Sequence, residues 1–246
     1  MKVVVFGGAT GMGLALARRM AARGDAVFLL GIEPDLLAGA AADLRARHPL
    51  RIPVRWALCD LERPEGFAGA LDEADAALDG FDTVVVTAAM FATQQELEAD
   101  VELARRLLVA NHAHTVAFCE RARRRLAPRG GGRLVVFSSV AGDRGRKPVG
   151  IYGSSKAGLS AYLEALDHAL YGTGTSVTCV KPGFVRTGMT ARLPVPPFAG
   201  EPDGVAEEVL RAIDERRPVV YAPAIWSPIM RVVRLLPRWV MRRTAF

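Results

Sequence analysis

The stretch K-V-V-V-F-G-G-A-T-G-M-G, residues 2 to 13, decides the fold that the sequence predicts. Its first five residues form a β-rich run that leads directly into glycines, and L-A-L-A-R-R-M-A-A-R-G at 14–24 follows with a helical pattern. Gly7, Gly11 and Gly13 let a turn take left-handed dihedrals and let the backbone approach a ligand closely. The N-terminus of the following helix offers free N–H groups and a positive dipole end to a pyrophosphate. We expect a dinucleotide-binding turn here, and a tight turn without a ligand is the alternative.

The rest of the chain alternates strand and helix patterns. Apolar runs typical of buried strands lie at 2–6, 26–30, 53–58, 82–87, 133–138, 176–181 and 218–221. Helical patterns lie between them, at 12–23, 34–47, 65–78, about 95–127, 150–171 and 203–216. Valine-, isoleucine- and leucine-rich strands separated by helices predict a parallel sheet covered on both faces. Right-handed crossovers make it doubly wound, so we expect an α/β, Rossmann-like, three-layer fold in one domain over residues 1–223, with a loop at 194–202.

A second stretch, I-Y-G-S-S-K-A-G at 151–158, places Tyr152 and Lys156 four positions apart among small residues. Residues i and i+4 lie one above the other on a helix face, so both side chains can enter one cleft. A phenol has an unperturbed pKa of ~10. A nearby ammonium and the positive charge of an oxidised nicotinamide would lower this pKa and make Tyr152 a usable general acid or base. An ordinary surface pair is the alternative.

Composition limits the other classes of function. Half of the 246 residues are hydrophobic, which is enough for a substantial core. Cys59, Cys119 and Cys179 form no C-x-x-C pair, so they predict a reducing compartment and no disulfide framework. The first residues do not read as a signal peptide, and no apolar run reaches the ~20 residues of a membrane-spanning helix. The net charge of +6 does not indicate a nucleic-acid partner, because the arginine-rich run at 121–125 lacks interleaved aromatic residues.

The motifs together resemble the short-chain dehydrogenase/reductase family, in its single-domain branch. The glycine motif of that family, T-G-x-x-x-G-x-G, is similar to F-G-G-A-T-G-M-G at 6–13, with Phe6 in place of the threonine. C-D-L at 59–61, F-S-S-V-A-G at 137–142 and V-K-P-G-F-V-R-T at 180–187 match further family segments in the family's order.

The resemblance implies a role for several residues. Asn111, in A-N-H-A-H, would position water for a proton relay, and Ser139 would hydrogen-bond the substrate carbonyl. Tyr152 would transfer the proton, and Lys156 would also bond the nicotinamide ribose. V-T-A-A at 86–89 departs from the family's N-N-A-G, which leaves the backbone at Ala88 as the contact. The implied cofactor contacts are Gly7, Ala9, Thr10, Gly11, Met12, Gly13, Gly31, Asp60, Leu61, Ala88, Tyr152, Lys156, Pro182, Gly183, Val185 and Thr187. No metal-ligand spacing is present, so we expect no metal site.

The second strand bears on the choice of nicotinamide. In the resembling family, an acidic residue at the end of this strand selects NAD, and Gly31 occupies that position here. No arginine follows to bind a 2′-phosphate, and Glu33 nearby favours NAD instead. The sequence favours NADP(H) as cofactor and leaves NAD(H) open.

The last 23 residues, 224–246, differ from the rest in charge, because they hold five arginines and no acidic residue. Ile229, Val232, Val233 and Leu236 recur at helical spacing, and Trp226 and Trp239 flank them. This pattern fits an amphipathic helix at 225–243 lying on an anionic membrane and broken near Pro237. A helix packed on the domain or on a second subunit fits the same composition.

These observations predict a cytoplasmic NADP(H)-dependent oxidoreductase that interconverts a ketone and a secondary alcohol. The basic tail is similar to that of bacterial reductases of lipid-linked keto-sugars, so an apolar or lipid-linked substrate at the membrane face is expected. A soluble NAD-dependent alcohol dehydrogenase and a non-catalytic dinucleotide sensor are the rival hypotheses. The resemblance also implies a homodimer or homotetramer, paired through the helices at about 95–127 and 150–171.

Overall fold

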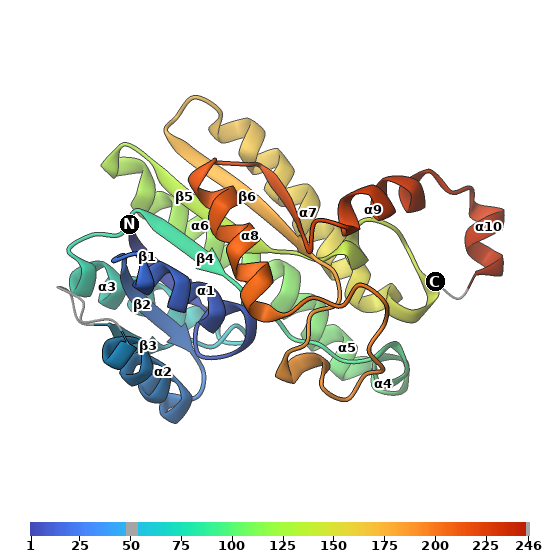
Figure 1. Cartoon of the computed structure of the whole chain (residues 1–246), viewed down its shortest axis with the longest axis horizontal. Coiled ribbons are helices and arrows are strands. Elements are labelled where there is room, and N and C mark those ends of the chain that lie inside the picture. Colours follow the sequence, from blue (N-terminus) through green and yellow to red (C-terminus); the bar gives the residue numbers. More distant parts are fainter. Residues whose placement is uncertain (48–53, 245–246) are drawn as a thin grey trace.

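A single seven-stranded parallel sheet forms the centre of the computed structural model, which describes residues 1–47 and 54–244 (Figure 1). The strand order is β3-β2-β1-β4-β5-β6-β7. The strands are β1 (Lys2–Phe6), β2 (Ala26–Gly31), β3 (Arg55–Leu58), β4 (Thr83–Val86), β5 (Gly132–Phe137), β6 (Thr175–Pro182) and β7 (Val219–Ala222). The chain moves outward from β1 in one direction to β3 and then restarts at β4 on the other side of β1, as a doubly wound sheet requires. The predicted fold class is therefore confirmed.

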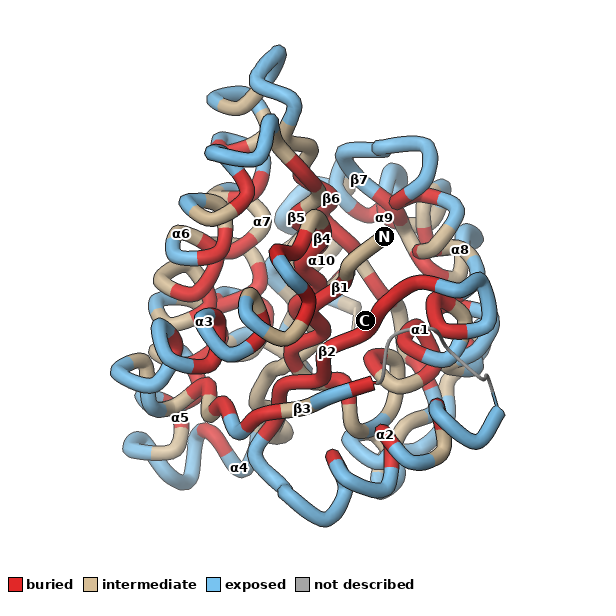
Figure 2. The backbone as a smooth tube through the Cα atoms, turned by 90° about the vertical axis from the view of Figure 1, so that its left-hand side faces the viewer, coloured by how far each residue is buried: buried red, intermediate tan, exposed pale blue. Residues whose placement is uncertain are grey.

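Helices cover both faces of the sheet, which explains why its strands are apolar on both sides. One face packs on α1 (Gly11–Ala22), α2 (Pro34–Arg47) and α8 (Pro202–Asp214). The other packs on α3 (Phe67–Leu78), α6 (Thr115–Leu126) and α7 (Gly150–Leu170). The central strands β1, β2, β4 and β5 are accordingly almost wholly buried, whereas the edge strands β3 and β7 are partly exposed (Figure 2).

The element boundaries agree with the sequence-based prediction except in the region 95–127. The predicted single helix is divided into α4 (Gln94–Ala99), α5 (Val101–Leu108), a π-helical turn at Val109–His114, and α6. The predicted start of the third strand, at Pro53, lies outside the described residues. The predicted loop at 194–202 extends to Glu201, and α8 begins at Pro202.

The arginine-rich run at 121–125 lies on α6, and two of its arginines have carboxylate partners. Arg123 pairs with Glu120 on the same helix, and Arg125 pairs with Asp72 of α3. Exposed pairs of this kind contribute about 0–1 kcal/mol each. This part of the run is therefore neutralised within the chain.

The C-terminal segment forms two short helices, α9 (Trp226–Leu235) and α10 (Arg238–Arg243), separated at Leu236 and Pro237. Trp226, Met230 and Val233 of α9 are buried in a small cluster with Val140. The sequence left open whether this segment packs on the domain or on a second subunit, or binds a membrane. In the structure, one face of α9 packs on the domain. The domain boundary at 223 stays a prediction.

Candidate active site

A cleft opens at the carboxyl ends of β1, β2 and β4, where the direction of winding reverses. Loops that follow β1 and β4 diverge at such a point, so open α/β sheets bind ligands there. The cleft has a volume of about 420 Å³. Its lining includes residues from the turns after β1, β2, β3, β4 and β6.

The turn after β1 leaves no space for side chains at two of its glycines. Gly7 adopts a φ of +86°, which favours glycine. Gly13 lies so close to Gly7 that a Cβ on it would overlap the Gly7 carbonyl oxygen and the Thr87 side chain. The first turn of α1 is thereby pressed against the ends of β1 and β4.

The N-terminus of α1 is open to an anion. Thr10 is the N-cap residue, its side chain makes no capping hydrogen bond, and the first turn holds no acidic residue. Thr10, Gly11 and Met12 line the cleft. Free N–H groups at a positive dipole end fit a pyrophosphate, so these residues suit a dinucleotide.

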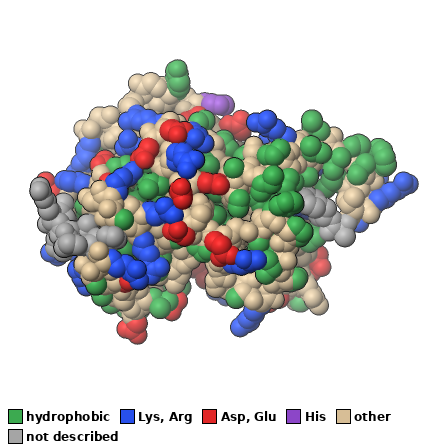
Figure 3. Space-filling view, viewed as in Figure 1, with side chains coloured by type: hydrophobic (Ala, Val, Ile, Leu, Met, Phe, Trp, Pro, Cys, Tyr) green, Lys and Arg blue, Asp and Glu red, His purple; other side chains and the backbone are tan. Residues whose placement is uncertain are grey.

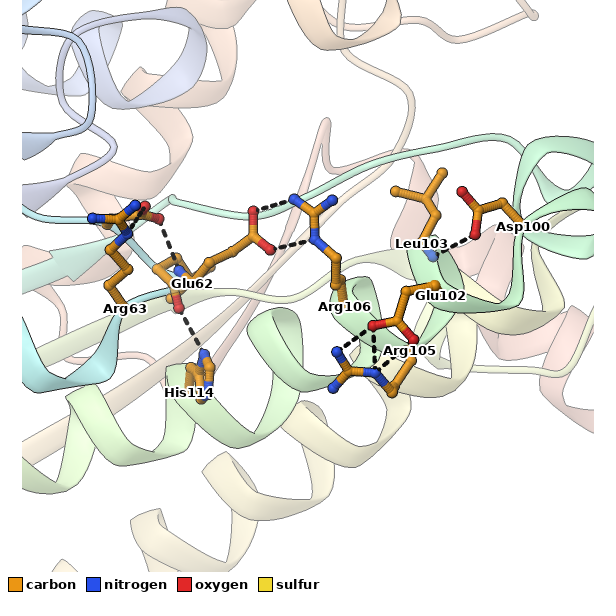
Figure 4. Close-up of polar contacts among 10 residues, drawn as sticks. Glu62, Arg63, Asp100, Glu102, Leu103, Arg105, Arg106 and His114 are labelled. Carbon is orange, nitrogen blue, oxygen red and sulfur yellow. Dashed lines mark hydrogen bonds and ion pairs between the residues drawn. The ribbon is translucent and has the colours of Figure 1, made fainter.

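The loop after β3 is bonded to α5 and to the π-helical turn (Figure 4). Asp60 Oδ1 accepts a hydrogen bond from the Glu62 backbone N–H at 2.8 Å. Glu62 forms a two-bonded ion pair with Arg106 of α5, with both N–O distances at 2.8 Å. The His114 ring Nδ1 lies 2.8 Å from the Leu61 carbonyl oxygen. Asp60 and Leu61 are thus held in the cleft wall. No pattern in the sequence indicated these roles of Arg106 and His114.

Asn111 lies fully buried in the π-helical turn and connects it to the segment after β4. Its Oδ1 accepts from the Met90 N–H at 2.7 Å, and its Nδ2 donates to the Met90 carbonyl oxygen at 2.8 Å. The side-chain amide therefore fixes the backbone that lines the cleft. The water relay that the family resemblance implied for Asn111 stays a prediction.

Ser139, Tyr152 and Lys156 lie together where β5 ends and α7 begins. The Ser139 hydroxyl accepts from the Ala141 N–H at 3.1 Å and lies within hydrogen-bonding reach of the Tyr152 hydroxyl. Lys156 is buried and donates to the Phe137 carbonyl oxygen at 2.9 Å, and its Nζ lies 5.8 Å from the centre of the Tyr152 ring. The ring of Phe91 packs edge-on against Tyr152 at 5.2 Å, which places Tyr152 next to the Met90 end of the cleft.

Burial controls the protonation of this group in the ligand-free chain. It raises the pKa of Tyr152 to about 12, and the hydrogen bond with Ser139 offsets this in part. It also lowers the pKa of Lys156 to about 8. The sequence-based expectation of a lowered tyrosine pKa included the charge of a bound oxidised nicotinamide; in the ligand-free chain, desolvation of the phenolate is the largest cause and raises the pKa. At neutral pH Tyr152 therefore holds its proton and Lys156 is mostly an ammonium.

The cleft contains most of the predicted cofactor contacts. Those that line it are Gly7, Ala9, Thr10, Gly11, Met12, Gly13, Gly31, Asp60, Leu61, Ala88 and Thr187. Pro182, Gly183 and Val185 belong to the end of β6 and the turn that leads to Thr187. Residues that line the cleft without having been predicted as cofactor contacts include Ile32, Leu36, Glu62, Met90 and Met189. All of them lie within five positions of a predicted contact. Their place in the loops at the strand ends is the sequence signal that could have identified them.

A buried polar cluster of Asp143, Lys181 and Tyr221 lies next to the turn that Ser139 caps. The Asp143 carboxylate, with its side chain 2 % exposed, accepts from Lys181 Nζ at 2.6 Å and from the Tyr221 hydroxyl at 2.7 Å. Asp143 directly follows the short helical turn Val140–Gly142 that Ser139 caps, and Lys181 directly precedes Pro182. The cluster therefore joins the serine turn to β6 and β7.

Comparison with known proteins settles the family. The family model described as short chain dehydrogenase matches residues 1–195. The chain belongs to the short-chain dehydrogenase family. An uncharacterized oxidoreductase of Mycobacterium tuberculosis is 35 % identical to it over 241 residues, covering 98 % of this chain and 96 % of the relative. An uncharacterized oxidoreductase of Streptomyces coelicolor is 37 % identical over 246 residues, covering 98 % and 94 %.

Solved short-chain dehydrogenase structures share the fold. L-Sorbose reductase from Gluconobacter frateurii, solved with NADPH and L-sorbose, superposes with a TM-score of 0.78 at 21 % identity, covering 89 % of this chain and 93 % of that one. As a short-chain dehydrogenase, the chain is a nicotinamide-dinucleotide-dependent oxidoreductase acting on the CH–OH/C=O pair.

Proposed function

We propose that this short-chain dehydrogenase reduces a ketone to a secondary alcohol, with Tyr152 as the general acid. The observation that carries the proposal is the convergence of Ser139, Tyr152 and Lys156 beside the Met90 end of the dinucleotide cleft. If Tyr152 and Lys156 were an ordinary surface pair on a helix, Lys156 would be exposed, whereas it is buried.

Each residue has a defined task in this proposal. The Ser139 hydroxyl donates to the substrate carbonyl oxygen and holds it where negative charge develops. Tyr152, protonated at neutral pH, gives its proton to the same oxygen. The Lys156 ammonium stabilises the phenolate that remains. A reduced nicotinamide, when bound, supplies the hydride that the carbonyl carbon receives.

NADPH is the cofactor that we propose, since Gly31 offers no carboxylate at the end of β2. L-Sorbose reductase, which shares the fold, was solved with NADPH. Glu33 is the specific observation that favours an NAD-dependent dehydrogenase as the second candidate. It lines the cleft together with Asp60 and Glu62, and none of the described lining residues is basic. A 2′-phosphate would meet this negative charge unfavourably.

We further propose an apolar or lipid-linked ketone as the substrate. The loop after β6 exposes Met189, Val195 and Phe198, and Met189 also lines the cleft. Exposed large apolar side chains in a loop that borders a site suit contact with an apolar ligand. We also expect self-association through the helices of about 95–127 (α4, α5 and α6) and through α7, as the family resemblance implies, which light scattering would check.

The test is NADPH and NADH consumption across a panel of short and long-chain ketones. We expect faster turnover of the apolar ketones and a loss of about 10²–10⁴-fold in kcat for Tyr152→Phe, with dinucleotide binding retained. Glu33→Gln is expected to improve kcat/KM for NADPH relative to NADH. Undiminished turnover by Tyr152→Phe would remove the mechanism, and a strong NADH preference in the unaltered enzyme would favour the second candidate.

A further inference from the structure

The two C-terminal helices leave a large apolar surface uncovered. One face of α9 is buried against Val140, whereas Val232 and Leu235 on the same helix are 61 % and 84 % exposed. Trp239 of α10 is 62 % exposed, and no residue of α10 is buried. We call Val232, Leu235 and Trp239 the apolar edge. In Figure 3, hydrophobic side chains gather over the end of the molecule where these helices lie.

The charged side chains of the tail are all arginines. Arg231, Arg238, Arg242 and Arg243 are exposed, and none of them takes part in an ion pair within the described residues. Arg243 instead lies over the Trp239 ring at 5.8 Å. Elsewhere in the chain several exposed arginines form ion pairs with carboxylates, as in Arg186–Glu201, Arg211–Glu207 and Arg217–Glu215. The tail itself offers its arginines no such partner, because residues 224–246 contain no acidic side chain.

The apolar edge is held in a fixed position next to the catalytic group. Arg144 donates to the Leu236 carbonyl oxygen at 2.8 Å, and Lys147 donates to the Arg242 carbonyl oxygen at 2.6 Å. Both donors lie in the segment between Ser139 and α7, and Val140, which α9 covers, is the neighbour of Ser139. In Figure 1 the two helices project from one end of the molecule.

We propose that α9 and α10 dock this protein on an anionic membrane surface. The apolar edge would enter the boundary between headgroups and acyl chains, and the four arginines would contact anionic headgroups. A second copy of the chain fits this surface less well. An isologous contact would bring the same uncompensated arginines of both copies together. The inference does not depend on the reaction proposed above.

Vesicle sedimentation of the full chain tests the proposal. We expect binding to vesicles of phosphatidylcholine with phosphatidylglycerol, weak binding to phosphatidylcholine alone, and release as salt rises from about 0.15 M to about 1 M. The emission of Trp239 should shift to shorter wavelength on binding, and Trp239→Phe should remove this shift.

Matched variants separate the tail from the general surface. Leu235→Asp, and Arg242→Gln together with Arg243→Gln, should each weaken binding about tenfold or more. Val101→Asp changes an equally exposed residue of α5, and Arg121→Gln with Arg124→Gln removes two exposed charges of α6. Both controls should bind as the unaltered protein does. Equal loss in tail and control variants, equal binding to neutral vesicles, or no binding at all would overturn the proposal. Self-association that Leu235→Asp abolishes would assign the surface to a second copy and overturn it as well.

Discussion

Lys156 shows how burial of one side chain makes stability depend on pH. An unfolded lysine titrates near ~10.4, and Lys156 in the folded chain titrates at about 8. Between these two values the unfolded chain binds more protons, so the contribution of Lys156 to the free energy of unfolding rises with pH. Below about pH 8 burial of the charged ammonium lowers the free energy of unfolding by its full amount.

Lys156→Met removes this titration. We expect the free energy of unfolding of the variant, relative to that of the unaltered protein, to be higher at neutral pH than at about pH 10.4. The difference should change by about 3 kcal/mol at most over this range. Urea unfolding of both proteins at a series of pH values measures it. The difference between the two proteins isolates Lys156 from the buried cysteines and tyrosines, which titrate in the same region. Parallel pH curves would contradict the assignment.

Asp143 is the second residue whose loss we expect to be costly. Asp143→Asn would leave the Lys181 ammonium, which is 12 % exposed, without its carboxylate. Breaking a buried pair in this way costs about 3 kcal/mol. Asp79→Asn is the matched control, because the pair of Asp79 with Lys2 is exposed and should contribute little. Urea unfolding compares the two, and equal effects would show that the Asp143 cluster is not structural.

At the scale of elements, the turn between β1 and α1 depends on glycine for its packing. Gly13→Ala would force the first turn of α1 away from the Gly7 carbonyl, so we expect lower stability and much weaker dinucleotide binding. Gly39→Ala in α2 is the control, because its Cβ would meet open space. It should raise the free energy of unfolding by about 0.5–1 kcal/mol. Urea unfolding and dinucleotide titration read out both variants, and a harmless Gly13→Ala would show that the turn can relax.

The elements also show where prediction from sequence stopped. Period and composition located every strand and most helices, since each buries a regular apolar face. The division of 95–127 was missed although local signals were present. Thr93 and Glu96 form a capping box at the start of α4, and Asp100 caps α5. No such local signal marks the π-helical turn, and its residue Asn111 bonds to Met90, 21 positions away in the sequence.

At the scale of the whole molecule, the tail is two units with different roles. None of the described helices has both the length and the apolarity needed to cross a membrane. The sequence could not say which tail residues pack and which stay exposed, because Val140, the partner of α9, lies some 90 positions away. For the same reason, the pairing of Lys181, Asp143 and Tyr221 could not be predicted.

Two truncations test this division. Ending the chain after Pro237 removes α10, which buries no residue, and we expect little change in the free energy of unfolding. Ending it after Ala224 also removes Trp226, Met230 and Val233 and should cost at least about 3 kcal/mol. Thermal and urea unfolding compare them. Equal stability of the two would show that α9 does not support the domain, whereas loss of stability in both would give α10 a structural role.

The contact between Trp226 and Gly183 has a consequence for protein engineering. The indole ring occupies the space that a Cβ at Gly183 would need. A domain from a relative that carries a side chain at the position of Gly183 therefore cannot accept this tail, because that side chain would overlap the indole ring. A chimera has to inherit both positions from the same parent.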